Sequence, residues 1–258
     1  MKESKTKTNG RNTMLKSILT LGTAMALTAG AAFAESHAMT VRIGTEGAYA
    51  PFNFINDAGE IDGFEKELGD ELCVRAELTC EWVKNDWDSI IPNLVSGNYD
   101  IIMAGMSITD ERDEVIDFTQ NYTPPSDSAF AAASEDVDLE GGVIAAQTAT
   151  IQAAHIAEGG ATLLEFATPE ETVAAVRNGE ADAVFADKDY LVPLVEENAE
   201  LMFVGDDVPL GGGVGVGLRE SDTELKEKLD AAIASMKEDG TLNTMITKWF
   251  GEDAKTYE

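Results

Sequence analysis

The chain is poor in basic residues, histidine and cysteine. Its 258 residues include 18 Lys and Arg against 48 Asp and Glu, which gives a formal net charge of −30 at pH 7, with 2 His and 2 Cys. So acidic a chain repels phosphate backbones, so nucleic acid is not expected as a partner. Two thiols without a histidine near them in sequence make a poor zinc cage, and we expect neither a metal nor a cofactor.

Long apolar runs are also missing. No segment approaches the roughly 18 apolar residues that a membrane span needs. The run from Ile18 to Leu27 is short, follows five basic residues, and is itself followed by Ala32-Phe33-Ala34. This pattern indicates a cleavable secretory signal over residues 1–34, with either Met1 or Met14 as its start. We therefore expect an exported, soluble mature chain with a net charge of about −34.

The two cysteines, Cys73 and Cys80, lie seven positions apart. An even cysteine count in an exported chain favours a disulfide, and this spacing suits a helix end joined to the next strand. Closing so short a loop contributes roughly 2–3 kcal/mol in the chain-entropy model.

The mature chain alternates between strand and helix patterns, and this alternation is broken twice. Pro124-Pro125 forces extended backbone within residues 121–127, and Gly211 to Gly213 form a glycine run. The pattern between these breaks restarts as an α/β unit, so we expect two lobes, each with a mostly parallel sheet flanked by helices. The expected boundaries are lobe 1 at 35–123 and 214–258, lobe 2 at 128–204, and hinges at 124–127 and 205–213.

Residues 98–112 are the most informative stretch for function. Ile101 to Met103 suit a buried strand, and we expect this strand to run straight into a helix that Thr109 caps. Arg112 would then lie beside free backbone N–H groups and hydroxyls, where a guanidinium can bind a carboxylate bidentately. The alternative from the residues alone is a salt bridge to one of the neighbouring acids.

Several strings along the mature chain resemble one family. These are TEGAYAPFNF (45–54), GEIDGFEKEL (59–68), NDWDSIIPNL (85–94), MAGMSITDER (103–112), VIDFTQNY (115–122), ADAVFAD (181–187) and EDGTLNTMITKWF (238–250). Together they resemble the polar amino-acid family (family 3) of periplasmic solute-binding proteins, nearest to its lysine/arginine/ornithine, histidine and opine-binding members. The resemblance implies a type II two-lobe fold with one ligand in the interlobe cleft, hinge closure, and delivery to an inner-membrane ABC permease. It also implies a periplasmic monomer.

The resemblance also implies a set of ligand-binding residues. Arg112, Ser107 and Thr150 correspond to positions that bind the ligand carboxylate, and Asp187 to the position that takes the α-ammonium. Tyr49 and Trp87 correspond to aromatic walls, and Glu46 and Glu65 to acids near the distal end of the ligand. The remaining expected contacts come from the two loops that carry these groups: Ala104, Gly105, Met106, Ile151 and Gln152.

Each of these residues also has an ordinary structural interpretation. Asp187 could be a helix N-cap, Trp87 plain core, and Glu46 and Glu65 surface acids. Tyr49 could merely pack its turn, and Ser107 and Thr150 could be turn or cap hydroxyls. The chain also departs from the family pattern, since relatives carry serines at the positions of Ala104 and Gly105 and glycine at that of Ala149.

The first functional hypothesis is capture of a cationic amino acid: arginine, lysine or ornithine. Glu46 and Glu65 would receive the distal cation, and Trp87 would stack on it. Opines or a neutral polar amino acid such as glutamine are the alternatives, and a sensory ligand-binding domain is another. A dehydratase on this fold would need a general acid such as Glu65, but the expected cleft has no histidine, nucleophile–base pair or metal set, so we do not expect an enzyme.

Overall fold

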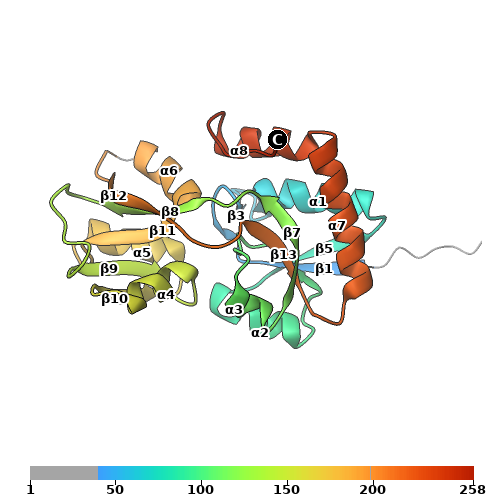
Figure 1. Ribbon diagram of the computed structural model, residues 1–258, viewed down its shortest axis with the longest axis horizontal. Coiled ribbons are helices and arrows are strands. Elements are labelled where there is room, and N and C mark those ends of the chain that lie inside the picture. The colour runs from blue at the N-terminus through green and yellow to red at the C-terminus, as the bar shows by residue number, and fades with distance from the viewer. Residues whose placement is uncertain (1–39, 198) are drawn as a thin grey trace, which may run out of the picture. The chain divides into compact units, whose positions relative to one another are not determined.

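The computed structural model describes residues 40–197 and 199–258 (Figure 1). The expected signal segment, residues 1–34, lies outside the described residues. No helix in the described ranges is long and apolar enough to cross a membrane.

The first sheet has five strands in the order β5-β1-β6-β13-β7. Their bounds are Thr40–Thr45 (β1), Thr79–Lys84 (β5), Ile101–Ile102 (β6), Asp117–Thr123 (β7) and Val214–Leu218 (β13). Strand β1 pairs in parallel with β5 and β6, as the alternating strand and helix patterns predict. Strand β13 is antiparallel to β6 and β7, because the chain re-enters this sheet from the second one.

The second sheet repeats this plan in the order β10-β9-β11-β8-β12. Its strands are Asp127–Ala132 (β8), Val143–Gln147 (β9), Thr162–Phe166 (β10), Ala183–Asp187 (β11) and Met202–Pro209 (β12). Strand β9 is parallel to β10 and β11, whereas β8 is antiparallel to β11 and β12. Two of the four pairings in each sheet are parallel and two are antiparallel, so the sheets are mixed and not mostly parallel as expected. The expected two-lobe α/β class is confirmed.

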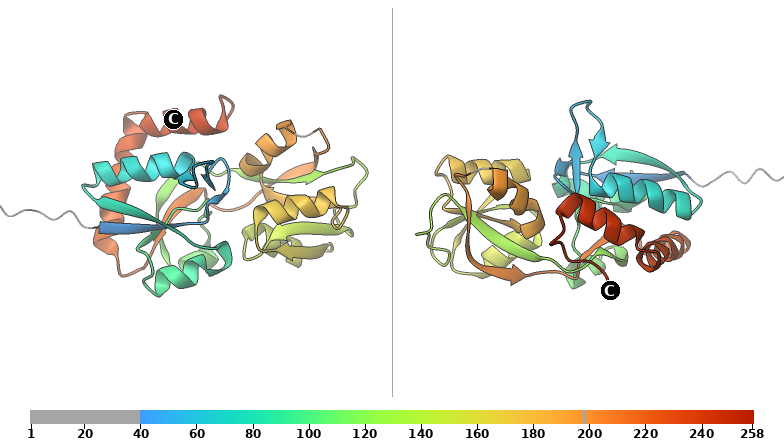
Figure 2. Two further views of the ribbon diagram at one scale, coloured as in Figure 1. Left: turned by 180° about the vertical axis from the view of Figure 1, so that it is seen from behind. Right: turned by 90° about the horizontal axis from the view of Figure 1, so that it is seen from above.

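Helices cover both faces of each sheet. They are Phe64–Arg75 (α1), Ile90–Val95 (α2), Asp110–Asp113 (α3), Ile151–Glu158 (α4), Pro169–Arg177 (α5), Lys188–Glu197 (α6), Thr223–Glu238 (α7) and Thr241–Phe250 (α8). In Figure 1, α1 and α8 lie on one side of the first sheet and α2 and α3 on the other. The view from behind in Figure 2 shows α7 and α8 beside α1.

Side chains along each strand point alternately to the two faces of the sheet, and this alternation explains why helices cover both faces. In the second sheet, Ala131 and Val184 belong to the apolar core that contains α5 and α6 residues. Their neighbours Phe130 and Phe185 point to the opposite face, where they pack with Ile156 of α4. Successive strand residues point to opposite faces, so a strand that is apolar on both sides must be covered on both sides.

Local signals explain several element ends. Thr168 caps α5 through a capping box with Glu171, and Pro169 occupies the first helical position. Pro92 is tolerated because it lies in the first turn of α2. The predicted disulfide is present and joins Cys73 in α1 to Cys80 in β5.

The second expected hinge is shorter in the structure. Strand β12 continues to Pro209, so the first five residues of the expected hinge 205–213 are in a strand. The segment between β1 and α1 forms a small three-stranded sheet of Ala48–Tyr49 (β2), Asn53–Ile55 (β3) and Ile61–Asp62 (β4), which the sequence analysis did not predict. These strands have two or three residues each, too few for a period of two to be visible.

The chain crosses between the sheets at residues 124–126 and 210–213. The C-terminal segment lies against the first crossing. Lys255 Nζ donates to Asp127 Oδ2 at 3.1 Å and to the Pro125 carbonyl oxygen at 3.3 Å. Tyr257 Oη donates to the Asn121 carbonyl oxygen at 2.9 Å. Hydrogen bonds therefore hold the C-terminal segment against the first crossing between the two sheets.

Candidate ligand-binding site

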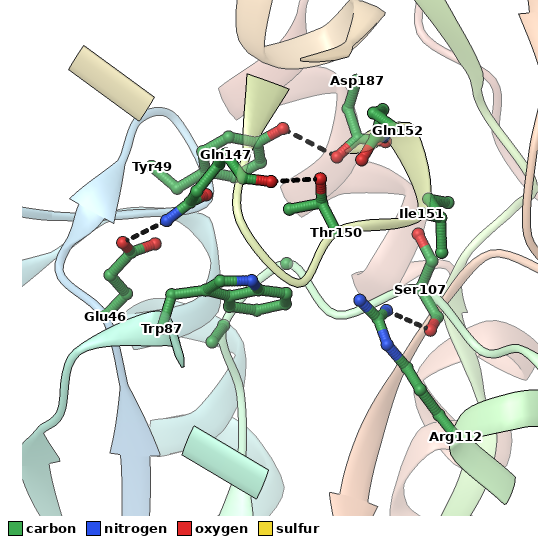
Figure 3. A pocket seen from close by; sticks show the side chains of 12 residues that line it. Glu46, Tyr49, Trp87, Ser107, Arg112, Gln147, Thr150, Ile151, Gln152 and Asp187 are labelled. Atoms are coloured by element: carbon green, nitrogen blue, oxygen red, sulfur yellow. Dashed lines mark hydrogen bonds between the residues drawn. The ribbon is translucent and has the colours of Figure 1, made fainter. Parts of the chain in front are cut away.

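A pocket lies at the carboxyl ends of strands from both sheets. Its walls are the last residues of β9 and β11 and residues from the segments that follow β1, β5, β6 and β9. Ligand sites in α/β sheets form at the carboxyl ends of strands, where loops are free to carry functional groups. The lining residues are Glu46, Tyr49, Trp87, Ala104, Gly105, Ser107, Arg112, Gln147, Thr150, Ile151, Gln152 and Asp187 (Figure 3).

Arg112 carries a positive charge to one end of this pocket. Thr109 caps α3 by accepting from the Arg112 backbone N–H, as expected. The guanidinium donates to the Ser107 carbonyl oxygen at 2.8 Å and to the Ala149 carbonyl oxygen at 3.4 Å. Burial lowers the Arg112 pKa to about 10, so the group stays cationic at neutral pH. Among the described residues it forms no ion pair, so the alternative of a salt bridge to a neighbouring acid is not realised.

Asp187, the last residue of β11, supplies a partly buried carboxylate. Oδ2 accepts from Tyr49 Oη at 2.7 Å and Oδ1 accepts from Gln152 Nε2 at 2.8 Å. Desolvation by burial raises the Asp187 pKa to about 6, partly opposed by these donors and by Arg112. An ammonium group placed beside Asp187 would favour the ionised carboxylate and offset much of the free-energy cost of its desolvation.

Glu46 supplies a second carboxylate, directly after β1. This residue is 4 % exposed, and its Oε1 accepts from Gln147 Nε2 at 2.7 Å. Burial raises the Glu46 pKa to about 7. Figure 3 shows Glu46 and Arg112 at opposite ends of the pocket, with the Trp87 indole between them.

Two aromatic side chains form walls. Tyr49 stacks on Tyr190 with ring centroids 4.4 Å apart, which fixes the Tyr49 ring as a flat surface. Trp87 is buried, and the Arg112 guanidinium carbon lies 5.4 Å from its ring centroid. The Trp87 indole N–H has no acceptor among the described residues.

The Ala104–Ser107 loop separates β6 from α3, so the strand does not run straight into the helix as expected. Gly105 has φ +63°, and a Cβ there would lie 3.1 Å from the Tyr49 ring. Glycine therefore lets the loop pass close under the aromatic wall. Ser107 lines the pocket and bridges to Val214, the first residue of β13.

Two expected site residues do not line the pocket. Met106 is 1 % exposed and packs in the apolar cluster with Ile90 and Leu94. Glu65 is fully buried in α1, where Oε1 accepts from the Gly105 N–H at 2.7 Å and Oε2 from Asn53 Nδ2 at 2.7 Å. Tyr122 also donates to Glu65, and burial raises the Glu65 pKa. Glu65 thus holds the Gly105 loop, and its position does not suit a general acid over a ligand.

The second loop begins at the end of β9. Ala149 has φ +56°, a conformation that favours glycine. Thr150 caps α4 by accepting from the Ala153 N–H at 3.1 Å and donates to the Gln147 carbonyl oxygen at 2.6 Å. Its hydroxyl is therefore a cap hydroxyl that also borders the pocket, beside Ile151 and Gln152 at the positive end of α4.

Gln147 is the lining residue that the sequence analysis left out. Gln147 is the last residue of β9, and residues at the carboxyl ends of parallel strands face the ligand edge of a sheet, which was the available signal. Among residues 40–197 and 199–258 no group of three His, Cys, Asp or Glu is arranged to hold a metal ion.

Comparisons with known proteins agree with this geometry. The model of bacterial extracellular solute-binding proteins, family 3, matches residues 41–252. A crystal structure of a periplasmic His/Glu/Gln/Arg/opine family-binding protein from Silicibacter pomeroyi, in complex with lysine, is similar to 84 % of this chain and 100 % of its own, with 80 % identity and a TM-score of 0.83.

Curated relatives align along nearly their whole length. The octopine-binding periplasmic protein of Rhizobium meliloti is 32 % identical over 93 % of this chain and 98 % of its own. The lysine/arginine/ornithine-binding periplasmic protein of Escherichia coli (strain K12) is 30 % identical over 92 % of this chain and 97 % of its own. The chain therefore belongs to family 3 of the bacterial extracellular solute-binding proteins, as its sequence motifs predicted.

Proposed function

We propose that this chain is the periplasmic receptor of an amino-acid ABC transporter and that it captures arginine, lysine or ornithine. The balance of charge in the pocket carries the proposal. Arg112 supplies one positive charge, and Asp187 and Glu46 supply two negative charges when ionised. A buried charge is costly unless it is paired, so the complementary ligand has one negative and two positive groups.

The arrangement of these groups supports a defined ligand orientation. The α-carboxylate lies at Arg112, the α-ammonium at Asp187, and the distal cation at Glu46. Tyr49 and Trp87 provide flat surfaces along the alkyl chain, and an indole face also attracts a guanidinium or ammonium. Closure about the two crossings, residues 124–126 and 210–213, would bring the two walls together around one ligand before its transfer to the inner-membrane permease.

The Trp87 indole N–H favours a second candidate. This donor is buried and has no acceptor among the described residues, although it belongs to a pocket-lining side chain. A ligand with an additional acceptor would satisfy it, as the second carboxylate of an opine or the side-chain carbonyl of glutamine does. The octopine-binding relative fits this alternative in chemical class.

A thermal-shift screen of ligand-free, refolded protein tests the proposed ligand class. At about 100 times its dissociation constant a ligand adds roughly 2.7 kcal/mol to the free energy of unfolding. For a chain of this size we expect the unfolding temperature to rise by ~5–10 °C with arginine, lysine or ornithine. A larger rise with opines or glutamine would favour the second candidate. No response to any α-amino acid would contradict both.

Affinity for cationic ligands is expected to fall as the pH is lowered from 8 to 5. Burial raises the pKa of Asp187 to about 6 and that of Glu46 to about 7, so protons compete with the ligand cations in this window. The stability of ligand-free protein is expected to change in the opposite direction. Because folding raises the pKa of both carboxyl groups, their protonated forms stabilise the folded state below about pH 4, and this stabilisation is lost as the pH rises through 6 and 7.

Titration calorimetry at pH 5, 6, 7 and 8 and constant ionic strength measures this dependence. We expect arginine to lose at least about tenfold in affinity between pH 8 and pH 5. The fixed charges near Glu46 are Lys84, Asp86 and Asp88, and those near Asp187 are Asp189 and Arg112. The same affinity at all four pH values would contradict ionised carboxylates as the ligand's partners.

A further inference from the structure

The Tyr49 side chain connects the two lobes. Tyr49 lies in β2, between β1 and α1 of the first lobe. Its ring stacks on Tyr190 of α6, with centroids 4.4 Å apart and an angle of 11° between the ring planes. Helix α6 packs on β8 and β11 of the second sheet. The Tyr49 hydroxyl also donates to Asp187 at the end of β11, so two contacts of one side chain join the lobes (Figure 3).

Tyr190 itself is not part of the pocket wall. The described residues that line the pocket include Tyr49 but not Tyr190. Tyr190 is 5 % exposed and belongs to the same apolar core as its neighbour Leu191. Its ring covers one face of the Tyr49 ring, because the two planes are nearly parallel. Tyr190 can therefore influence a bound ligand only through Tyr49.

Opening of the lobes would separate the two rings. The chain crosses between the sheets at residues 124–126 and 210–213, and a hinge motion about these crossings moves one wall away from the other. Strand β2 also contacts α5 of the second lobe, so this part of the first lobe rests directly on the second. The stack of Tyr49 on Tyr190 thus belongs to the closed state. A contact that exists in one of two states shifts the equilibrium toward that state.

We propose that Tyr190 is a positioning residue for ligand capture: by stacking on Tyr49 across the two lobes it stabilises the closed state and slows the release of every bound ligand. This inference rests on the proposed function and extends it from the choice of ligand to the time for which the ligand is held. The apparent affinity of a ligand that binds the closed state scales with the population of that state. Loss of the stack should therefore weaken all ligands by one common factor, about threefold to tenfold.

Two other roles of Tyr190 make different predictions. If the ring only fills the core of the second lobe, its loss should lower the unfolding temperature and leave the release rate unchanged. If the ring touched the ligand, its loss should affect ligands of different length to different extents. A common factor that appears in the release rate distinguishes the proposed role from both.

The test is stopped-flow fluorescence of Tyr190→Leu at pH 8 with arginine, lysine and ornithine. Trp87 lines the pocket, so its emission reports ligand binding. We expect the dissociation rate constant to rise about threefold to tenfold, by the same factor for each ligand, and the association rate constant to stay within about twofold of the wild type. Tyr190→Phe keeps the ring and should retain both rate constants within about twofold.

A double-mutant cycle tests whether Tyr190 acts through Tyr49. Titration calorimetry gives the affinity for arginine of Tyr49→Leu, of Tyr190→Leu and of the double variant. Once Tyr49 is replaced there is no ring for Tyr190 to stack on, so adding Tyr190→Leu should lower the affinity by less than about twofold. The same additional loss in both backgrounds would contradict the proposal.

Phe130→Leu is the matched control. Phe130 stacks on Phe185 with ring centroids 4.2 Å apart, and both belong to neighbouring strands of the second sheet. Its loss removes a stacked ring of similar burial that does not join the lobes. We expect a lower unfolding temperature with both rate constants within about twofold of the wild type.

The outcomes separate this inference from the proposed function. If wild-type protein binds none of the three amino acids, the proposed function fails. If it binds them and Tyr190→Leu releases them at the wild-type rate, only the inference fails. Unequal factors among the ligands, or faster release in Tyr190→Phe as well, would also overturn it. Tyr190→Met fills a similar volume without a ring and takes the place of Tyr190→Leu if that variant does not fold.

Discussion

Replacing Arg112 with alanine is expected to remove detectable binding of every α-amino acid. The guanidinium is the cation of the pocket, and it has no carboxylate partner among the described residues. A ligand carboxylate placed in the variant would be buried without a counter-charge, at a cost of roughly 3–5 kcal/mol. We expect affinity to fall by at least about a hundredfold, whichever amino acid the wild type prefers.

Calorimetry on folded, ligand-free variants measures this effect, with circular dichroism as the check on folding. Arg177→Ala is a matched control because it removes the same side chain from the exposed last turn of α5. Arg112→Lys keeps the charge but loses bidentate geometry, so we expect it to bind with intermediate affinity. Near-normal affinity in Arg112→Ala would exclude Arg112 as the carboxylate partner.

The second large effect is expected for Asp187→Asn. This change keeps the shape of the side chain but removes the charge that would pair with the ligand ammonium. An uncompensated ammonium in the closed pocket costs roughly 3–5 kcal/mol, so affinity for all α-amino acids should fall by at least about a hundredfold. The ligand-free variant should unfold at the same or a higher temperature at pH 8, because burial opposes ionisation of Asp187.

Thermal unfolding at pH 8 and calorimetry together distinguish lost binding from lost folding. Asp189→Asn provides the control, since Asp189 lies two residues further along the chain and does not line the pocket. We expect it to change affinity by less than about threefold. Unchanged affinity in Asp187→Asn, or a loss that appears only because the variant unfolds, would argue against pairing with the ammonium.

Much of the fold was predictable because local signals agree with the tertiary structure. Thr168 and Pro169 mark the start of α5, Thr150 marks that of α4, and Pro124-Pro125 lie in the first crossing. The short elements were missed for a physical reason. The paired strands at 48–62 are stabilised by contacts with one another and with α1, and such contacts leave no periodic pattern in two or three residues.

Site residues were predictable where their position in a strand or helix also determines where the side chain points. Asp187 ends a parallel strand and Arg112 occupies the first turn of a capped helix, and the structure brings both to the pocket. Glu65 was misplaced because helical phase alone does not show which buried face a carboxylate occupies. Its partners Asn53, Gly105 and Tyr122 come from three separate segments, and only the folded chain brings them together.

Gln147 is a pocket residue that the sequence could not single out. A glutamine at a strand end has no distinctive chemistry in sequence, and its contact with Glu46, 101 positions away, appears only in the folded chain.

The hydrogen bonds of the C-terminal segment have a consequence for the design of an optical amino-acid sensor from this chain. Lys255 and Tyr257 connect the end of the chain to residues 121–127, beside the crossing about which closure is proposed. A fluorescent protein fused after residue 258 would pull on those contacts and change the affinity that the sensor is meant to read. A small dye on the exposed Glu180, at the far end of α5 from the pocket, would leave the crossing untouched.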